Sequence, residues 1–455
     1  MSEKNSGQRD SFSTNFGAIA AIAGSAIGLG NIWRFPYVTG ENGGGAFLFI
    51  YLIFIVSIGV PVMISEFIIG RSTQRNPYGA FRLLAPGKPW FLIGLMGVLA
   101  AFFILSFYTT VAGWTLEYFY QSVTGNLGGK GHDELTAMFS SFLDHPFRPY
   151  LWFLIFMGLT ALIIISGVKN GIERYTKLLM PLLFILLLLL VIRSLTLKGA
   201  GEGLKFLFRP DFSKITPKVI LEALGQGFFS LSIGMGTLIT YGSYIRKKDN
   251  LTRTASLVVF SDTMIAIVAG VAIFPAVFAL GGSAASGEGL MFVVLPEVLH
   301  KLPFGNIFSL LFFILLAVAA ITSTISVLEV IVAFLVEEKN MPRKKATVIA
   351  TVSVSILGLL TVASLGSLKD FTILGKNIFG ILEYLTANIM LPLGGLFIVI
   401  FTGWFLSRAI LKSEMTNNGE IKTRYLPVYL VLVRYLAPVA IACVFLYSLG
   451  ILKFW

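Results

Sequence analysis

Long apolar segments alternate with short polar connections along the whole chain, a pattern typical of membrane-spanning helices. Most segments reach the roughly 20 residues that a helix needs to cross the hydrocarbon layer of a bilayer. The eleven expected spans cover residues 14–38, 45–70, 90–122, 149–167, 172–193, 217–243, 254–281, 305–336, 346–366, 374–407 and 426–450. The pattern therefore predicts an all-α membrane protein with one transmembrane domain over residues 1–455, made of spans 1–5 (about 14–193), spans 6–10 (about 217–407) and span 11 (about 426–450).

Composition excludes a soluble protein and sets the expected orientation in the membrane. Of the 455 residues, 56% are hydrophobic and 13% are charged, so a soluble fold would leave too much apolar surface in water. The net charge of +12 does not indicate nucleic-acid binding, because the basic residues cluster in short connections between spans. The connection over residues 71–88 is basic and lacks acids, which predicts that it is cytoplasmic. Counting from there predicts a multi-pass protein of the cell inner (plasma) membrane with a cytoplasmic N-terminus and an outside C-terminus.

The first span is interrupted by the sequence GSAIGLGNIWRFP at residues 24–36. Glycine costs about 1 kcal/mol and proline about 3 kcal/mol in a helix interior relative to alanine. Lipid offers no replacement for lost backbone hydrogen bonds, so non-helical backbone at this depth persists only where it lines a cavity or binds a ligand. The interruption therefore predicts a binding site in span 1.

A short internal repeat suggests that a second span is interrupted in the same way. The sequence IGLG at residues 27–30 of span 1 matches IGMG at residues 233–236 of span 6. An offset of five spans reverses the membrane orientation, so the two halves would be inverted. Paired glycine-interrupted spans are the best sequence indication of a midplane transport site, although Gly-x-Gly is also common in helix packing.

Four motifs carry a resemblance that covers most of the chain. They are AGSAIGLGNIWRFP followed by ENGGGAF in span 1, GQGFFSLSIGMGTLITYGSY in span 6, GLMFVVLPEVL before span 8 and AAITSTISVLE in span 8. With them the chain resembles the bacterial neurotransmitter:sodium symporter family, in its eleven-span form that transports hydrophobic or aromatic amino acids. The resemblance implies two inverted five-helix repeats with broken helices 1 and 6. Many members have a twelfth span, which is not expected here.

The interruption in span 1 is expected to bind the carboxylate of an amino acid. Where the helix unwinds, backbone amides near Leu29 and Gly30 lie at the positive N-terminal end of the next half-helix, which suits an anion. By resemblance, the Tyr108 hydroxyl supports that carboxylate. Relatives that transport amines carry an acid at the position of Gly28, so glycine here predicts a substrate that brings its own carboxylate.

The resemblance also implies two sodium ions, held by the oxygen ligands that a hard cation takes. The first site would use the Ala26 carbonyl, Asn31, Ser230, a residue of span 7 and the substrate carboxylate. That shared carboxylate would couple sodium binding to substrate binding. Residues of spans 1 and 8 would form the second site, namely Gly24, Ile27, Ala319, Thr322 and Ser323.

Span 7 departs from the family pattern at Asp262, which lies where relatives usually have the sodium-binding Asn. Chloride-dependent relatives carry a serine nearby, and Ala266 occupies that position here. An ionised acid at membrane depth is costly and usually functional. We hypothesise that Asp262 supplies the negative charge that chloride supplies in relatives, so that chloride is not required.

By resemblance, mostly apolar side chains surround the substrate, and their burial of apolar area favours a hydrophobic or aromatic L-amino acid. Met235 replaces a Phe that is common in relatives, and its adaptable side chain suits several substrate shapes. The complete predicted substrate set is Ala26, Gly28, Leu29, Gly30, Ile104, Tyr108, Phe229, Ser230, Ser232, Met235, Ser323, Thr324 and Val327.

Two gates are expected on either side of the site. Outside, Arg34 would pair with Glu383 of span 10. Inside, Arg9 would pair with Glu337 near Tyr244, and Phe12 replaces a usual Trp, which predicts weaker anchoring of the N-terminus.

Span 5 carries Gly171 and Pro181 near its cytoplasmic start. Pro181 removes a backbone hydrogen bond, so local unwinding there is expected to let water reach the second sodium site, unless the proline only bends the helix.

Other functions remain open at this point. A channel would need a continuous polar lining, whereas polar residues here gather around the two interruptions. No HExxH sequence or nucleophile elbow is present, so an enzyme is not expected. A symporter of another small amino-acid-like solute and a non-transporting amino-acid sensor are the alternatives. The expected partners are an L-amino acid, sodium ions and membrane lipid, with the oligomeric state left open.

Overall fold

The computed structural model describes residues 11–279, 281–282, 291–300 and 303–452. In this part of the chain, nine helices are long and apolar enough to cross a membrane, and the bent pair Asn15–Ala26 and Gly30–Glu41 makes a tenth span. The predicted span 217–243 is present as two shorter helices separated by residues 231–236, which accounts for the eleventh segment. The prediction of an all-helical membrane protein is confirmed.

The helices follow the predicted spans, with short helices in several connections. Spans 1–5 and their connections contain α1 (Asn15–Ala26), η1 (Gly30–Arg34), α2 (Phe35–Glu41), α3 (Gly45–Phe54), η2 (Ile55–Gly59), α4 (Val60–Thr73), α5 (Pro77–Leu84), α6 (Phe91–Val123), α7 (His132–Leu143), α8 (Arg148–Ile165), η3 (Val168–Glu173), α9 (Arg174–Leu195), α10 (Ala200–Phe208) and η4 (Phe212–Lys214). Spans 6–11 contain α11 (Pro217–Ser230), α12 (Thr237–Gly242), α13 (Leu251–Ala279), α14 (Val294–His300), α15 (Gly305–Glu338), α16 (Arg343–Ala363), α17 (Ile378–Tyr384), η6 (Leu385–Met390), α18 (Leu391–Ile400), η7 (Phe401–Phe405), α19 (Arg408–Thr416), α20 (Leu426–Val431), η8 (Leu432–Leu436) and α21 (Ala437–Ser448).

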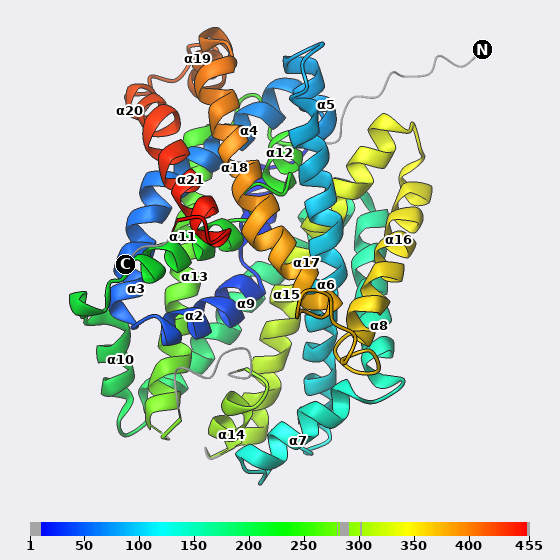
Figure 1. Cartoon of the computed structure of the whole chain (residues 1–455), viewed down its shortest axis with the longest axis vertical. Helices are drawn as coiled ribbons and strands as arrows, with labels where there is room; N and C mark the ends of the chain where they lie inside the picture. Colours follow the sequence, from blue (N-terminus) through cyan, green and yellow to red (C-terminus); the bar gives the residue numbers. More distant parts are fainter. Residues whose placement is uncertain (1–10, 280, 283–290, 301–302, 453–455) are drawn as a thin grey trace.

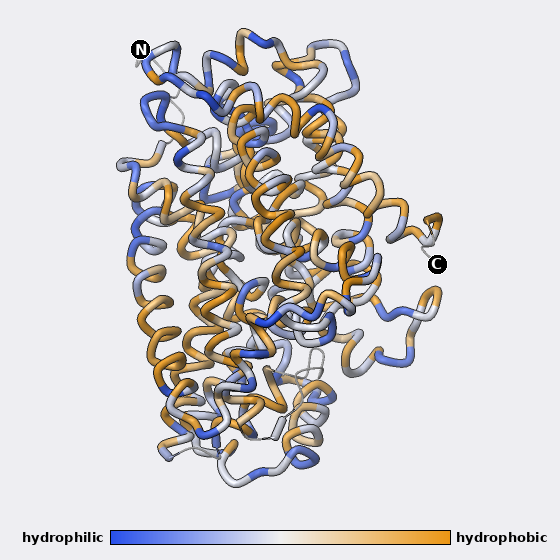
Figure 2. The backbone as a smooth tube through the Cα atoms, turned by 90° about the vertical axis from the view of Figure 1, so that its left-hand side faces the viewer, coloured by the Kyte–Doolittle hydropathy of each residue, from blue (hydrophilic) through white to orange (hydrophobic). Residues whose placement is uncertain are grey.

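The long helices α6 and α15 pack along each other and form the centre of the scaffold (Figure 1). The short helices α5 and α19 lie at one end of the molecule, and α7 and α14 lie at the other end (Figure 1). Hydrophobic residues fill the length between the ends, and hydrophilic residues gather toward both ends (Figure 2). This distribution is what a bilayer demands, because only satisfied helices with apolar surfaces persist in its interior.

The break in span 1 falls where the glycine-rich sequence predicts it. Helix α1 ends at Ala26, and Ile27 takes an extended backbone with φ −74° and ψ 100°. The chain becomes helical again at Gly30, in the π-helical turn η1 that leads into α2. The two halves of the span meet at an angle of 49°.

The break in span 6 depends on glycine and on a buried acid. Gly234 and Gly236 have φ values of +84° and +77°, a region that L-residues with side chains rarely adopt. A Cβ at Gly234 would also lie 2.4 Å from the Leu391 carbonyl oxygen. The Gly234 amide donates to Oε1 of Glu66 at 2.8 Å, and Glu66 is fully buried in α4. The second break is thus held in place from span 2.

The start of α1 is fixed by two charged residues from other parts of the chain. Glu173 accepts hydrogen bonds from the Ser13 amide at 2.7 Å and from the Ser13 hydroxyl at 2.5 Å. Arg246 donates to the Ser13 carbonyl at 2.8 Å. Hydrogen bonds from Arg246 to the Asp249 carboxylate raise the pKa of this arginine above its ordinary value. Hydrogen bonds therefore connect the beginning of span 1 to span 5 and to the connection between spans 6 and 7.

Candidate functional site

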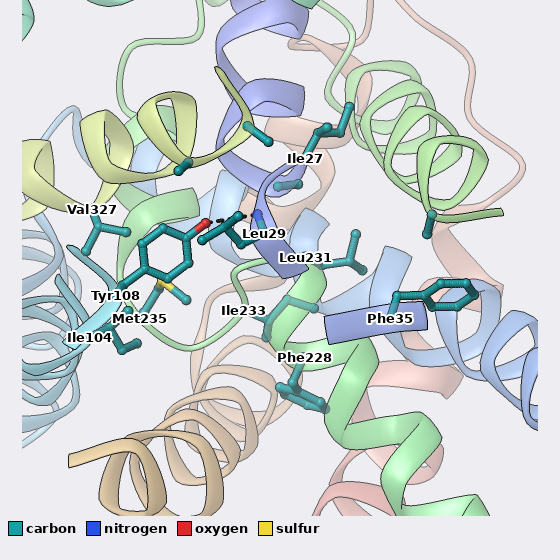
Figure 3. Close-up of a cluster of buried hydrophobic side chains, with 14 of the residues drawn as sticks. Ile27, Leu29, Phe35, Ile104, Tyr108, Phe228, Leu231, Ile233, Met235 and Val327 are labelled. Carbon is teal, nitrogen blue, oxygen red and sulfur yellow. Dashed lines mark hydrogen bonds between the residues drawn. The ribbon is translucent and has the colours of Figure 1, made fainter. Parts of the chain in front are cut away.

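The broken span 1 presents its backbone amides to two side chains. The Leu29 amide donates to the Tyr108 hydroxyl oxygen at 3.0 Å, and the Gly28 amide donates to Oδ1 of Asn31 at 3.1 Å. Figure 3 shows the Tyr108 hydroxyl reaching across from α6 to the Leu29 amide at the break. These contacts bring together the predicted amide donor and the predicted tyrosine beside the next half-helix.

A side chain at Gly28 would displace the hydroxyl groups that lie against this glycine. A Cβ there would lie 2.0 Å from the Ser323 hydroxyl oxygen and 2.9 Å from the Tyr108 hydroxyl oxygen. In this conformation an acid at position 28 would collide with both residues. Three predicted site residues from spans 1, 3 and 8 therefore meet at the break.

The predicted first sodium site is a cluster of three buried polar side chains. Asn31 Nδ2 donates to the Ser230 hydroxyl oxygen at 3.1 Å, to the Asp262 carbonyl oxygen at 3.0 Å and to Asp262 Oδ1 at 2.7 Å. The Ser230 hydroxyl lies 3.1 and 3.0 Å from the two carboxylate oxygens of Asp262. Asn31 and Asp262 are fully buried. Their amide, hydroxyl and carboxylate oxygens are the ligand types that suit a hard cation. Ala26 ends α1 immediately before this cluster.

The predicted second sodium site is partly assembled around Thr322. Its hydroxyl lies 3.3 Å from the Ile27 carbonyl oxygen and 2.9 Å from the Ala319 carbonyl oxygen, which joins α15 to the break. The Ser323 hydroxyl is directed to the Ser25 carbonyl at 3.5 Å. The α-carbon of Gly24 faces α9, where a Cβ would contact Thr176 and Met180. Oxygens of both spans thus meet here, as a cation site between them requires.

Apolar side chains surround the ring of Tyr108. Ile104, Met235 and Val327 gather around it from α6, from the break in span 6 and from α15 (Figure 3). All three are buried, with 3%, 3% and 6% of their surface exposed. These three residues are apolar members of the predicted substrate set.

The other members of the predicted substrate set that are polar or aromatic contact residues outside the apolar group around Tyr108. A Cβ at Gly30 would lie 3.3 Å from the Phe229 ring, so these two residues are in close contact. Ser232 donates to the Ser25 carbonyl at 3.2 Å. The Thr324 hydroxyl bonds with Thr160 of α8 at 2.9 Å, so it joins two helices in this conformation, which the family motif did not indicate.

At the predicted outer gate, Arg34 pairs with an amide instead of the predicted acid in this conformation. Its Nη1 donates to Gln226 Oε1 at 2.6 Å, and its guanidinium lies 5.1 Å from the centre of the Phe229 ring. Gln226 Nε2 donates in turn to the Gly30 carbonyl at 2.9 Å. Among the residues that the structure describes, no ion pair joins Arg34 to Glu383, because Gln226 and Phe229 already hold the guanidinium over span 6.

At the predicted inner gate, Tyr244 contacts an acid that the sequence did not single out. The Tyr244 hydroxyl donates to Glu329 Oε1 at 2.6 Å, and Arg343 forms an ion pair with the same carboxylate at 2.5 Å. Glu337 accepts from the amide of Asn76 at 2.8 Å. Its predicted partner Arg9 lies outside the described residues.

The structure also describes the predicted features of the N-terminal segment and of span 5. Phe12 is 1% exposed and packs edge-on against Tyr241 and Tyr244, with ring centres 5.9 and 6.0 Å away, so this phenylalanine is firmly packed. Helix α9 continues through Pro181 without a break in this conformation. The π-helical turn η3 contains Gly171, so the irregular part of span 5 precedes the proline.

Three contributing residues were missed by sequence reasoning. Glu66 holds the break in span 6, Gln226 joins Arg34 to Gly30, and Glu329 binds Tyr244 and Arg343. Glu66 and Glu329 are fully buried acids within predicted spans, which is a recognisable signal because ionisable groups inside a membrane are rare and usually functional. Gln226 lies in the span 6 motif but carries no charge that would single it out.

Comparison with known proteins identifies the family. The model of the sodium:neurotransmitter symporter family matches residues 9–137 and 143–454. The chain belongs to this family. It is 41% identical over 443 residues to the uncharacterised sodium-dependent transporter YhdH of Bacillus subtilis, covering 97% of this chain and 98% of that protein. Members of the family are sodium-dependent membrane transporters, so this chain is a transporter and not an enzyme.

A solved structure and an animal relative extend the comparison. The crystal structure of MhsT in complex with L-phenylalanine matches with a TM-score of 0.90 and 46% identity, covering 97% of this chain and 100% of that chain. This likeness confirms the symporter fold of two inverted five-helix repeats with broken helices 1 and 6. The sodium- and chloride-dependent GABA transporter 2 of Bos taurus is 29% identical over 493 residues, covering 97% of this chain and 80% of that protein.

Replacing Glu329 with Gln should open the end of the molecule near Tyr244. The substitution leaves an amide oxygen that still accepts from Tyr244 and Arg343, but it removes the charge that pairs with Arg343, so a weaker neutral contact replaces the ion pair. The measurement uses a parent protein in which Cys443→Ser removes the native thiol and Ser25→Cys adds a reporter thiol. A water-soluble thiol reagent should label this reporter roughly tenfold faster in E329Q than in the parent. A tenfold factor corresponds to about 1.4 kcal/mol.

The matched control is Glu420→Gln, which removes an exposed carboxylate from the connection after α19. It should label at the rate of the parent. Equal labelling rates for E329Q and E420Q would show that the Tyr244–Glu329–Arg343 contact does not close this end.

Proposed function

We propose that the protein couples sodium entry to the inward transport of a hydrophobic or aromatic L-amino acid by alternating access. The observation that carries the proposal is the Leu29–Tyr108 hydrogen bond at the break in span 1, beside a glycine whose Cβ position is filled by the Ser323 and Tyr108 hydroxyls. The break offers amide donors at the positive end of a half-helix, and position 28 beside them is a glycine rather than an acid. That combination suits a substrate that brings its own carboxylate.

The side chain of the substrate lies among Ile104, Met235 and Val327 in this proposal. Burial of apolar area contributes about 25 cal/mol per Å², which favours a large apolar side chain. The relative of 46% identity that was crystallised with L-phenylalanine supports the same class of substrate. Met235 is unbranched and adaptable, so we infer that several hydrophobic side chains are accepted.

Two sodium ions fit the oxygen atoms around the break. Asn31, Ser230 and Asp262, with the Ala26 carbonyl, would hold the first ion next to the substrate carboxylate. Thr322 and Ser323, with the carbonyls of Gly24, Ile27 and Ala319, would hold the second ion. Each ion supplies positive charge that stabilises the buried site, and a carboxylate shared with the first ion makes the two binding events reciprocal.

Alternating access requires that the two sides of the site open in turn. On the outer side, Arg34 and Glu383 belong to spans 1 and 10, and an ion pair between them would close the entrance in another conformation. On the inner side, Glu337 and the N-terminal Arg9 are proposed to act with the Tyr244 contact. The basic connection at residues 71–88 supports a cytoplasmic location for that end, in a protein of the plasma membrane.

Uptake into proteoliposomes tests the proposed function. With an inward sodium gradient, the purified protein should accumulate labelled L-phenylalanine, and L-leucine, L-tyrosine and L-tryptophan should compete. Glycine and GABA should not compete, because they leave the apolar pocket unfilled. Preferential uptake of GABA or glycine would contradict the substrate assignment, and binding without flux would indicate a sensor.

Chloride independence is proposed to rest on Asp262. Its buried carboxylate lies 2.7 Å from the Asn31 amide nitrogen and 3.0 Å from the Ser230 hydroxyl, so an acidic side chain adjoins the proposed sodium site. Asp262→Ser removes this acid and should make uptake depend on external chloride, since an anion is then needed to balance the sodium. Uptake by the wild type should be equal in chloride and gluconate. A D262S variant that transports equally well in both would contradict the assignment.

A further inference from the structure

A cavity of about 350 Å³ opens beside the short helix α5. Its lining consists of Arg75, Gly79, Arg82, Leu83 and Glu338. The volume is in the range of pockets that bind small molecules or headgroups. Nothing in the proposed transport cycle uses these residues.

The two arginines of the cavity are available for a ligand. Both are exposed, and among the described residues neither forms an ion pair or a side-chain hydrogen bond. Arginine presents a planar set of donors that matches a phosphate group with two parallel hydrogen bonds. The lining therefore favours a phosphate-bearing ligand.

The third charged group of the cavity is an acid. It therefore restricts which phosphate-bearing ligands fit the cavity. Glu338, at the end of α15, accepts from Asn76 Nδ2 at 2.9 Å, which holds its Oε1 in place. A Cβ on Gly79 would lie 2.6 Å from that same oxygen, so the glycine lets the carboxylate reach the cavity. Two positive groups and one negative group favour a ligand that carries both a phosphate and a cation.

The cavity also lies where lipid headgroups are found. Helix α5 connects the membrane-spanning α4 and α6, and Leu83 on its surface is 60% exposed. Nearby, Lys88 lies 5.5 Å from the centre of the Phe405 ring, and Phe405 packs against Trp90 at 4.6 Å. Aromatic and basic residues of this kind mark the boundary between membrane and water. A bound headgroup would leave its acyl chains beside the exposed Leu83.

We propose that this cavity binds the headgroup of phosphatidylethanolamine. Arg75 and Arg82 hold the phosphate, and Glu338 accepts hydrogen bonds from the primary ammonium. Phosphatidylcholine carries the same charges, but its quaternary ammonium has no hydrogen to donate to Glu338. Phosphatidylglycerol has the phosphate and no cation. The three charged residues thus distinguish ethanolamine lipids from both.

Native mass spectrometry of the whole purified protein tests the proposal without requiring transport. The protein is titrated with phosphatidylethanolamine, phosphatidylcholine or phosphatidylglycerol of identical acyl chains. Wild type should bind the ethanolamine lipid most tightly. The R75Q/R82Q variant should lose roughly tenfold in that affinity, because charge-assisted contacts to phosphate are lost. E338A removes the acceptor and should bind the ethanolamine and choline lipids equally.

The matched control is R253Q/K345Q, which removes two exposed basic side chains at the start of α13 and in α16, neither of which lines the cavity. It should keep wild-type lipid affinity, and a size-exclusion profile checks that every variant is folded. Tighter binding of phosphatidylglycerol by wild type would overturn the proposal, as would an unchanged affinity in R75Q/R82Q. Displacement of the lipid by millimolar inorganic phosphate would also overturn it, since that result indicates a site for a free anion.

Discussion

The hydrogen bonds of Asn31 connect the three segments on which the rest of the structure depends. This one side chain accepts from the Gly28 amide at the break and donates to Ser230 and Asp262. A buried carboxylate is costly at membrane depth unless charge-assisted hydrogen bonds or a cation balance it. Asn31 and Ser230 provide those hydrogen bonds, so the conformation of the break and the charge of Asp262 depend on each other. A bound sodium ion would add to the same balance.

The contact between Arg34 and Gln226 and the contact of Glu329 with Arg343 and Tyr244 differ in strength. On one side, Arg34 is held by the neutral amide of Gln226, and hydrogen bonds of this kind contribute only about 1.5–3 kcal/mol even with one charged partner. On the other side, the fully buried Glu329 pairs with Arg343 and binds Tyr244. Loss of a buried ion pair costs more, about 3–5 kcal/mol. The contact at Arg34 should therefore separate more readily than the contact at Glu329.

Much of the fold follows from sequence pattern alone, because a bilayer admits few structures. The apolar segments correspond to the observed helices, and the glycines of spans 1 and 6 lie at the observed breaks. The family motif brought Asn31, Ser230 and Asp262 together as a set. Side-chain partners were harder to predict, since they depend on the conformation. Arg34 can reach acids or amides of several spans, and Pro181 interrupts one hydrogen bond without breaking a helix whose neighbours remain packed.

The central claim is that sodium and an amino acid bind to one site at the break in span 1. Calorimetric titration of the purified protein with L-phenylalanine, in sodium and then in potassium at equal ionic strength, tests it most directly. Binding should be strong in sodium and lost in potassium, and L-phenylalanine should raise the affinity for sodium by the same factor that sodium raises the affinity for L-phenylalanine. Equal affinity for L-phenylalanine in sodium and potassium would contradict the account.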